Sequence, residues 1–126
     1  RFVTTTECDA SEIFKQAYID ATEADVEIIK SPVGMPGRAI FSDFLQKVKD
    51  GEKQPKSCPF HCIKTCQIET SPYCIMLALF NAYKGNMTMG YAFAGTNAHL
   101  ATAIVTVKYT MDAIQEEYKA REKELV

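Results

Sequence analysis

The sequence lacks the features that define several large classes of protein. It contains no run of about eighteen apolar residues, so no segment is predicted to cross a bilayer as a helix. We expect no secretory signal within these residues, because no basic stretch leads into an apolar one at the start. The net charge is -2 at pH 7, which favours neither nucleic acid nor an anionic membrane as a partner. Ser–His–Asp order and the HExxH, P-loop and GxGxxG motifs are also absent.

What is present is the composition of an ordinary globular domain. The chain has 126 residues, of which 47% are apolar and 24% charged, the usual size and balance of one domain. Five cysteines, an odd number, without a secretory leader favour a reducing setting, so a cytoplasmic location is predicted. Because the chain opens on Arg1 rather than Met, inside a β-branched run, we expect it to be cut from a longer one.

Hydrophobic periodicity and capping residues predict a mainly α-helical chain with one or two short strands. The β-branched stretches predict strands over residues 2–6 and 26–30. Helix starts are marked by capping residues, namely Asp9 with Glu12, Ser71, and Thr106. Helices are predicted over 10–21, 38–50, 72–85 and 107–123. The third is apolar nearly all round and should be the most buried element. The last is expected to bury Val107, Met111, Ile114 and Tyr118.

Four of the five cysteines lie in one stretch, at Cys58, Cys62, Cys66 and Cys74. One interpretation is a cysteine-bearing turn before a buried helix, and the other is a thiolate site that binds a metal or does redox chemistry. In a helix the first and third cysteines would lie roughly 12 Å apart along the axis, too far for one zinc ion. A single-metal site therefore needs a bent loop, or Cys62 and Cys66 acting with Cys74. The spacing of three residues suits zinc, but no second cysteine knuckle is present.

Two glycine-marked loops are candidates for binding. Residues 31–37 contain two prolines and two glycines, which predicts a shaped loop, with a plain connector as the alternative. In residues 94–97, the glycine after Ala94 allows another group to approach the backbone closely. His61 and His99 are candidates either for a ligand or for structural hydrogen bonding.

Several stretches together match one family in order and spacing. They are RFVTTTEC (1–8), FKQAYIDA (14–21), IIKSPVGMPGRAI (28–40), YAFAGTNAHL (91–100) and TVKYTMDAIQEEY (106–118). They resemble the C-terminal third of the FMN-dependent nitronate monooxygenases, formerly called 2-nitropropane dioxygenases. The close relatives of that family are the flavin-dependent type II enoyl-acyl-carrier-protein reductases. The run SPVGMPGRAI and the cysteines of 58–66 are similar to those of one bacterial subgroup.

The resemblance implies a TIM barrel with FMN at the C-terminal ends of its strands. Residues from about 1 to 30 would form the last barrel strand and helix, and about 31–126 a loop and helices with the cysteine cluster at 58–74. Ala94 and Gly95 are implied to approach the flavin. The residues implied at the substrate are Gly34, Met35, Gly37, Arg38, Thr96 and Asn97. Thr96 stands where the family's Ala-Gly-Gln motif has glutamine, and no catalytic residue of the family falls in this segment.

These implications predict the C-terminal fragment of an FMN-dependent oxidoreductase, which lines the substrate side of the flavin pocket and is inactive alone. The expected partners are the remainder of the same flavoprotein, a small nitronate or acyl substrate and a second copy in a homodimer, with no nucleic acid or membrane. Two alternatives come from other classes. One is a small non-enzymatic helical domain with a structural thiolate-metal site, and the other is an interaction module that exposes the apolar helix near residues 75–80.

Residues 34–38 and 94–97 are expected to converge on one side of the fold. Arg38 would then orient an anionic group, since its guanidinium forks onto carboxylates and nitronates. The alternative is that Arg38 only begins a helix and pairs with a nearby carboxylate such as Asp43.

The isolated chain is expected not to bind FMN tightly. In the resembled family a Gly-Thr directly before the stretch that matches Arg1 and Phe2 helps to hold the flavin phosphate, and this sequence does not contain it. Titrating the 126-residue chain with FMN and following the flavin fluorescence checks this expectation. Saturable binding at micromolar or lower concentration would contradict it.

Overall fold

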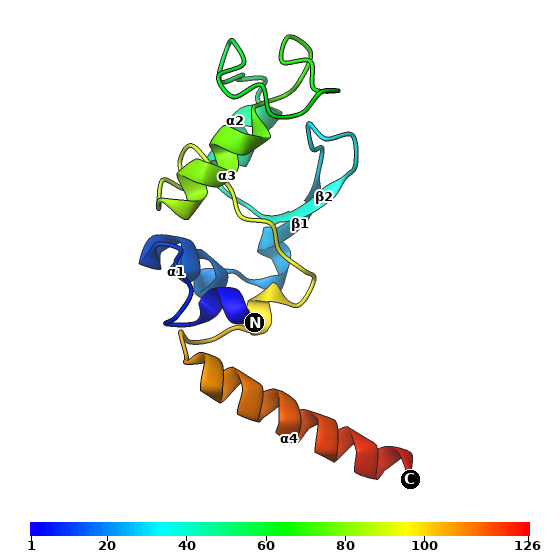
Figure 1. Ribbon diagram of the computed structural model, residues 1–126. Helices are drawn as coiled ribbons and strands as arrows, with labels where there is room; N and C mark the ends of the chain where they lie inside the picture. The colour runs from blue at the N-terminus through cyan, green and yellow to red at the C-terminus, as the bar shows by residue number, and fades with distance from the viewer.

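Helices and one short hairpin form the regular structure of the computed structural model, which describes residues 1–126 (Figure 1). The α-helices are α1 (Glu12–Asp20), α2 (Asp43–Lys49), α3 (Ile75–Tyr83) and α4 (Val107–Leu125). The antiparallel strands are β1 (Val26–Ile29) and β2 (Gly37–Ile40). Short 3-10 helices cover Phe2–Thr4, Glu23–Asp25 and Ala98–Leu100. The predicted mainly helical chain with one or two short strands is confirmed, and no helix combines the length and apolar character needed to cross a membrane.

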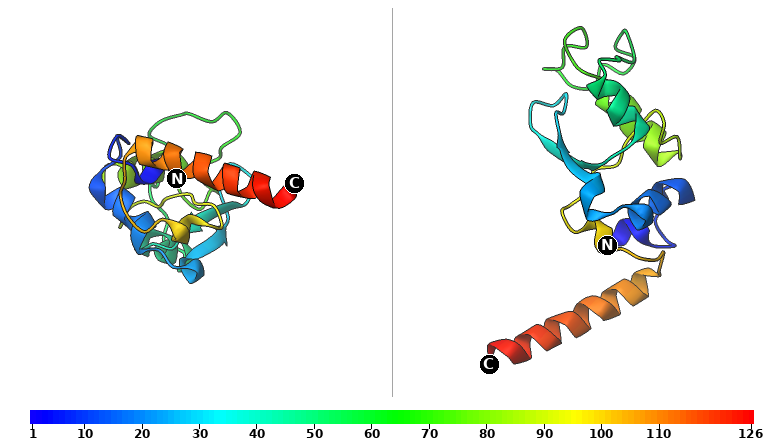
Figure 2. Two further views of the ribbon diagram at one scale, coloured as in Figure 1. Left: turned by 90° about the horizontal axis from the view of Figure 1, so that it is seen from below. Right: turned by 180° about the vertical axis from the view of Figure 1, so that it is seen from behind.

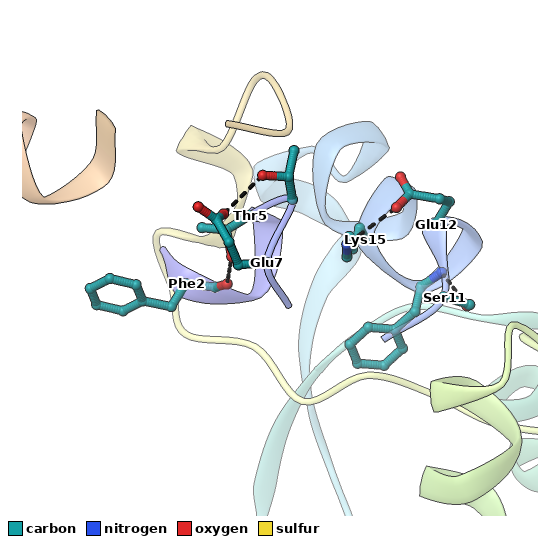
Figure 3. Close-up of polar contacts among 8 residues, drawn as sticks. Phe2, Thr5, Glu7, Ser11, Glu12 and Lys15 are labelled. Carbon is teal, nitrogen blue, oxygen red and sulfur yellow. Dashed lines mark hydrogen bonds and ion pairs between the residues drawn. The ribbon is translucent and has the colours of Figure 1, made fainter. Parts of the chain in front are cut away.

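Helix α1 begins later than its sequence signal suggested. Its N-cap is Ser11, whose Oγ accepts the backbone N–H of Phe14 at 3.2 Å (Figure 3), so the predicted cap at Asp9 is wrong. The Asp9 carboxylate instead accepts a hydrogen bond from a tyrosine hydroxyl at the end of α3. The buried residue of α1 is Lys15, only 2% exposed, and its Nζ donates to Glu12 Oε1 at 3.2 Å. Local capping therefore decides where this helix starts.

Residues 38–40, predicted as the start of a helix, are part of β2 instead. One edge of β2 pairs with β1, with Val26 opposite Ile40. On its other edge the N–H of Ile40 donates to the carbonyl of Ala92 at 3.0 Å. Backbone groups that have partners on both sides are satisfied in extended conformation, so the helix prediction fails here. Helix α2 starts only after Ser42, whose Oγ accepts a backbone N–H at 3.3 Å.

The N-terminal stretch, predicted as a strand over residues 2–6, begins as the 3-10 helix Phe2–Thr4. Only Thr5 has strand-like pairing, a single parallel bridge to Val105. The Thr5 hydroxyl donates back to the carbonyl of Phe2 at 2.7 Å (Figure 3). Such local side-chain bonds stabilise turns and compete with strand pairing, which explains the wrong assignment.

Helix α3 starts later and is less buried than predicted. Its N-cap is Cys74, whose Sγ accepts a backbone N–H at 3.5 Å, whereas the hydroxyl of Ser71 donates to the carbonyl of Tyr73. Its buried residues are two small ones, Ala78 and Ala82, while Ile75 and Leu79 are partly buried against the core. Its other face leaves large apolar side chains exposed, at Met76 (44%) and Phe80 (52%).

Three aromatic side chains, Phe44, Tyr73 and Tyr91, form the centre of the larger core cluster. Tyr73 and Tyr91 are fully buried and their rings meet edge to face, with centroids 5.6 Å apart. Phe44 lies against both rings. The two tyrosine hydroxyls are hydrogen-bonded at 2.9 Å, and that of Tyr73 also donates to the carbonyl of Lys30 at 3.3 Å. Burial raises the pKa of both hydroxyls, so both stay protonated.

Helix α4 projects away from the rest of the molecule (Figures 1 and 2). Its single buried residue is Thr110. The predicted buried side is therefore wrong at Met111 and Tyr118, which are 44% and 67% exposed, while Val107 and Ile114 are half-buried. The apolar stripe of α4 is present but has little of this chain to pack against.

Polar contacts hold the start of α4 to the N-terminal stretch. Both carboxylate oxygens of Glu7 accept the backbone N–H of Val107, at 3.1 and 3.0 Å. Hydrogen bonds from the Thr6 hydroxyl and from this N–H lower the pKa of Glu7. Farther along α4, Glu117 forms an ion pair of 2.6 Å with Arg1.

Gly90 lets the segment that follows it pass close to α3. A Cβ at Gly90 would lie 2.7 Å from the backbone nitrogen of Ala82 and closer still to the carbonyl oxygen of Ala78, and neither atom can move aside. Gly90→Ala should therefore lower the free energy of unfolding by about 1–3 kcal/mol or more, as overpacking does. Gly95→Ala is the control, since a Cβ there meets no atom within 4 Å. Chemical denaturation measures both variants, and equal stabilities would contradict the prediction.

Acidification should loosen α4 through Glu7. Because the folded-state pKa of Glu7 is lowered, its carboxylate stabilises the fold above the ordinary pKa of about 4.3 and loses that effect as the pH falls through the lowered value. Glu7→Gln should remove this part of the pH dependence. Thermal unfolding followed by circular dichroism between about pH 7 and about pH 3 measures it. Glu116→Gln, at an exposed position of α4, is the control, and equal pH dependence of wild type and Glu7→Gln would refute the role.

Candidate functional site

The segment after Gly90 runs beside β2 as a third extended stretch. Phe93 forms an antiparallel bridge with Ala39, and the N–H of Ala94 donates to the carbonyl of Arg38 at 2.9 Å. This pairing carries residues 94–97 next to Arg38, although nearly sixty positions of sequence separate them. The candidate site is therefore built on backbone pairing rather than on a flexible loop.

Arg38 and Thr96 are in direct contact. Arg38 Nη1 donates to Thr96 Oγ1 at 2.5 Å. Both side chains are exposed, and none of the ion pairs of the chain includes Arg38. The alternative that Arg38 begins a helix and pairs with Asp43 is wrong, because Arg38 lies in a strand and has no carboxylate partner. The prediction that the two segments converge is confirmed, while the roles of their residues in binding stay a prediction.

Two aromatic residues that the sequence analysis did not select shape this region. Phe93 lies against Gly37, where an added Cβ would be 2.5 Å from Phe93 Cε1, so a larger residue there would displace the ring. The hydroxyl of Tyr18, on α1, donates to the carbonyl of Phe93 at 2.5 Å. Burial, with a smaller contribution from nearby Cys8, raises the pKa of Tyr18 to about 12, so this donor stays protonated. In the sequence, only the position of Tyr18 on the apolar face of the first helix indicated that this side chain packs inward.

Nothing within the chain requires glycine at position 95. Its backbone does not occupy the left-handed region, and a Cβ would meet nothing within 4 Å. Gly34 differs, because its φ of +87° favours glycine for conformational reasons. The open space at Gly95 is therefore a place where a group from outside the chain can approach the backbone.

The remaining residues implied at the substrate are less closely tied to Arg38. Met35 is 70% exposed in the connection between β1 and β2. Asn97 is the N-cap of the 3-10 helix Ala98–Leu100, without a side-chain cap bond. In the same turn, His99 Nδ1 lies 3.1 Å from the carbonyl oxygen of Thr96. The structure thus joins Gly37, Arg38, Ala94 and Thr96 directly and leaves the others at the margins.

Two surface hollows lie elsewhere. One is lined by residues of α1, the turn before β1 and the start of α2, among them Asp20, Asp25 and Asp43. The other lies between α2 and the segment after it, with Phe44 and Met89 in its wall. Neither contains Arg38 or any residue of 94–97.

The predicted thiolate-metal site is not formed. No three His, Cys, Asp or Glu side chains lie together in an arrangement that could hold a metal ion. Cys74 is buried and uses its Sγ to cap α3, which separates it in role from the others. Cys58 accepts the backbone N–H of His61 at 3.3 Å, and Cys62 is exposed. All of the cysteines are free thiols.

Comparison with known proteins gives matches in family and fold. The family model described as nitronate monooxygenase matches residues 1–117. The structure of FabK from Thermotoga maritima is similar to this chain with a TM-score of 0.74 and 23% identity, over 99% of this chain and 37% of that one. A single-substitution mutant of the same FabK has a TM-score of 0.70 and 21% identity, over 99% and 33%. The chain spans about a third of the length of these solved structures, and no curated protein matches it.

Proposed function

The chain belongs to the nitronate monooxygenase family, and from that membership we propose that it forms the substrate-side wall of the flavin site in an FMN-dependent oxidoreductase. The observation that carries the proposal is the contact of Arg38 with Thr96, next to the open backbone at Gly95. When bound, FMN supplies electron transfer between an organic substrate and an acceptor. The residues of this chain bind and orient the substrate.

Arg38 is suited to an anionic substrate. A guanidinium carries five N–H donors, and Arg38 uses one of them on Thr96 without any carboxylate partner. Its remaining donors can fork onto the two oxygens of a nitronate. Thr96 holds the guanidinium in place, which lowers the entropy cost of binding.

Gly95 and Ala94 are suited to lie against the flavin. The position that a Cβ of Gly95 would fill is open, so a flat ring can approach the backbone there. The chain around Ala94 is held by its N–H bond to Arg38 and by the Tyr18 contact to its neighbour. A rigid backbone beside an open position is what close contact with a planar cofactor requires.

The length of the chain and its uncovered apolar side chains support a place in a larger protein. Met76, Phe80, Met111 and Tyr118 are each at least 44% exposed, and large apolar patches are normally covered. We assign residues from about 1 to 30 to the last strand and helix of a TIM barrel and the rest to its appended helices. The remainder of the same flavoprotein is then the partner that covers these faces, in the cytoplasm.

The resemblance to the type II enoyl-acyl-carrier-protein reductases suggests one other reaction, the reduction of an enoyl thioester with electrons from a nicotinamide. The charge of the site separates the two substrates. A nitronate is anionic at the reacting group, whereas an enoyl thioester is neutral there, so the free guanidinium of Arg38 favours the nitronate. Assaying the intact flavoprotein with a nitronate and oxygen, and with a nicotinamide and an enoyl thioester, distinguishes them.

Arg38→Ala should weaken substrate use in the intact enzyme and leave its flavin content unchanged. The loss of a charged hydrogen-bond pair lowers kcat/KM about 10- to 100-fold. Arg121→Ala is the matched control, because Arg121 lies at the exposed end of α4. Steady-state kinetics with flavin absorbance measures both variants. An unchanged kcat/KM for Arg38→Ala would show that Arg38 does not bind the substrate and has only a structural role.

A further inference from the structure

Three cysteines, Cys58, Cys62 and Cys66, lie in a long irregular connection that the proposed flavin site does not use. This connection runs from the end of α2 to the start of α3 and contains no helix or strand. It forms the end of the molecule opposite to α4 (Figures 1 and 2). Cys62 is exposed, the other two are half-buried, and all three are free thiols. Thiols in this setting are accessible to reagents from solution.

The backbone folds Cys58 back toward Cys62. Cys58 Sγ accepts the N–H of His61 at 3.3 Å, so this sulfur lies against the residue that precedes Cys62. His61 has a φ of 48°, in the left-handed region, which reverses the chain direction at that point. A disulfide needs two Cα atoms about 4.4–6.8 Å apart, and a reversal of the chain brings residues four positions apart closer together than an extended chain does. The hydrogen bond to His61 and the reversal of the chain there favour Cys58 and Cys62 as the pair.

The charge around these thiols favours an anionic reagent. No carboxylate occurs in the sequence between Glu52 and Glu69. The same stretch holds Lys53, Lys56 and Lys64, none of which forms an ion pair. This stretch of chain therefore carries only positive side-chain charge, which attracts a small disulfide with free carboxylates, such as glutathione disulfide.

We propose that Cys58 and Cys62 form a reversible redox pair that exchanges with a small anionic disulfide of the glutathione class. The Cys62 thiolate attacks one sulfur of that disulfide, and the other sulfur leaves as a thiolate that takes up the proton lost by Cys62. The Cys58 thiolate then attacks Cys62 Sγ and forms the Cys58–Cys62 bond. The second small thiol leaves with the proton lost by Cys58. Two protein thiols are oxidised by two electrons, and one small disulfide is reduced to two thiols.

The positions of the lysines give a direct test on the intact protein. Trypsin cleaves after Lys56 and Lys64, so residues 57–64 form one peptide that holds only Cys58 and Cys62. Cys66 and Cys74 fall together in the next peptide, residues 65–84. The protein is equilibrated in buffers with increasing ratios of oxidised to reduced glutathione, alkylated, digested and measured by mass spectrometry. The expected result is a 57–64 peptide that loses two hydrogens and both alkyl groups, and regains them in excess reduced glutathione.

Serine variants identify each thiol. Cys58→Ser should stop the reaction at a glutathione mixed disulfide on Cys62, and Cys62→Ser should abolish oxidation of the peptide. Cys66→Ser is the matched control in the same connection and should behave as wild type. Thermal unfolding of all three should match wild type, since the connection has no regular structure.

Four results would overturn the proposal. The first two are a 57–64 peptide that does not change across the whole glutathione series, and a disulfide that joins this peptide to the 65–84 peptide. The third is loss of the reaction in Cys66→Ser, and the fourth is protection of the cysteines from alkylation in a sample from which a metal chelator removes the protection. The last would assign the cysteines to a metal site.

Discussion

The contact between the buried rings of Tyr73 and Tyr91 is the constraint on which the rest of this structure depends. Their hydroxyls are hydrogen-bonded at 2.9 Å, in a place where an unpaired hydroxyl would be costly. The Tyr73 hydroxyl also reaches the carbonyl of Lys30, and Phe44 packs on both rings. The cluster thereby joins the end of β1, the helix α2, the approach to α3 and the segment that follows Gly90.

The candidate site follows from this anchor. Tyr91 is fully buried beside β2, and the residues after it continue along that strand, where Ala94 pairs with Arg38 through the backbone. The guanidinium of Arg38 then meets Thr96 at the surface. A rigid support beneath exposed polar groups suits a binding site, because the side chains are already ordered and binding then costs less conformational entropy. The side of the site away from the core remains open, which agrees with a chain about a third as long as the solved structures it resembles.

The cysteine-bearing connection is related to the same core in a different way. Its last residues, Tyr73 and Cys74, are buried and fixed, whereas Cys58 and Cys62 lie on its accessible part. One stretch of sequence therefore combines a structural thiol, which caps α3, with thiols that are free to react. This division explains why four cysteines in one stretch do not act as one ligand set.

The sequence by itself determined the features that depend on near neighbours. The Thr106 cap of α4, the apolar periodicity of α1 and the loop with two prolines and two glycines could be predicted because each rests on contacts within a few residues. The family resemblance also selected Arg38, Ala94 and Thr96 as parts of one site.

Only the tertiary structure decided what depends on distant partners. Residues 38–40 became a strand because segments on both edges pair with them, and Tyr18 entered the site through a carbonyl on another segment. Helix α3 was left half-exposed because only one side of it packs on the core, through Ile75, Ala78 and Leu79. Burial and strand pairing join residues far apart in the chain, so neither can be predicted from a local sequence pattern.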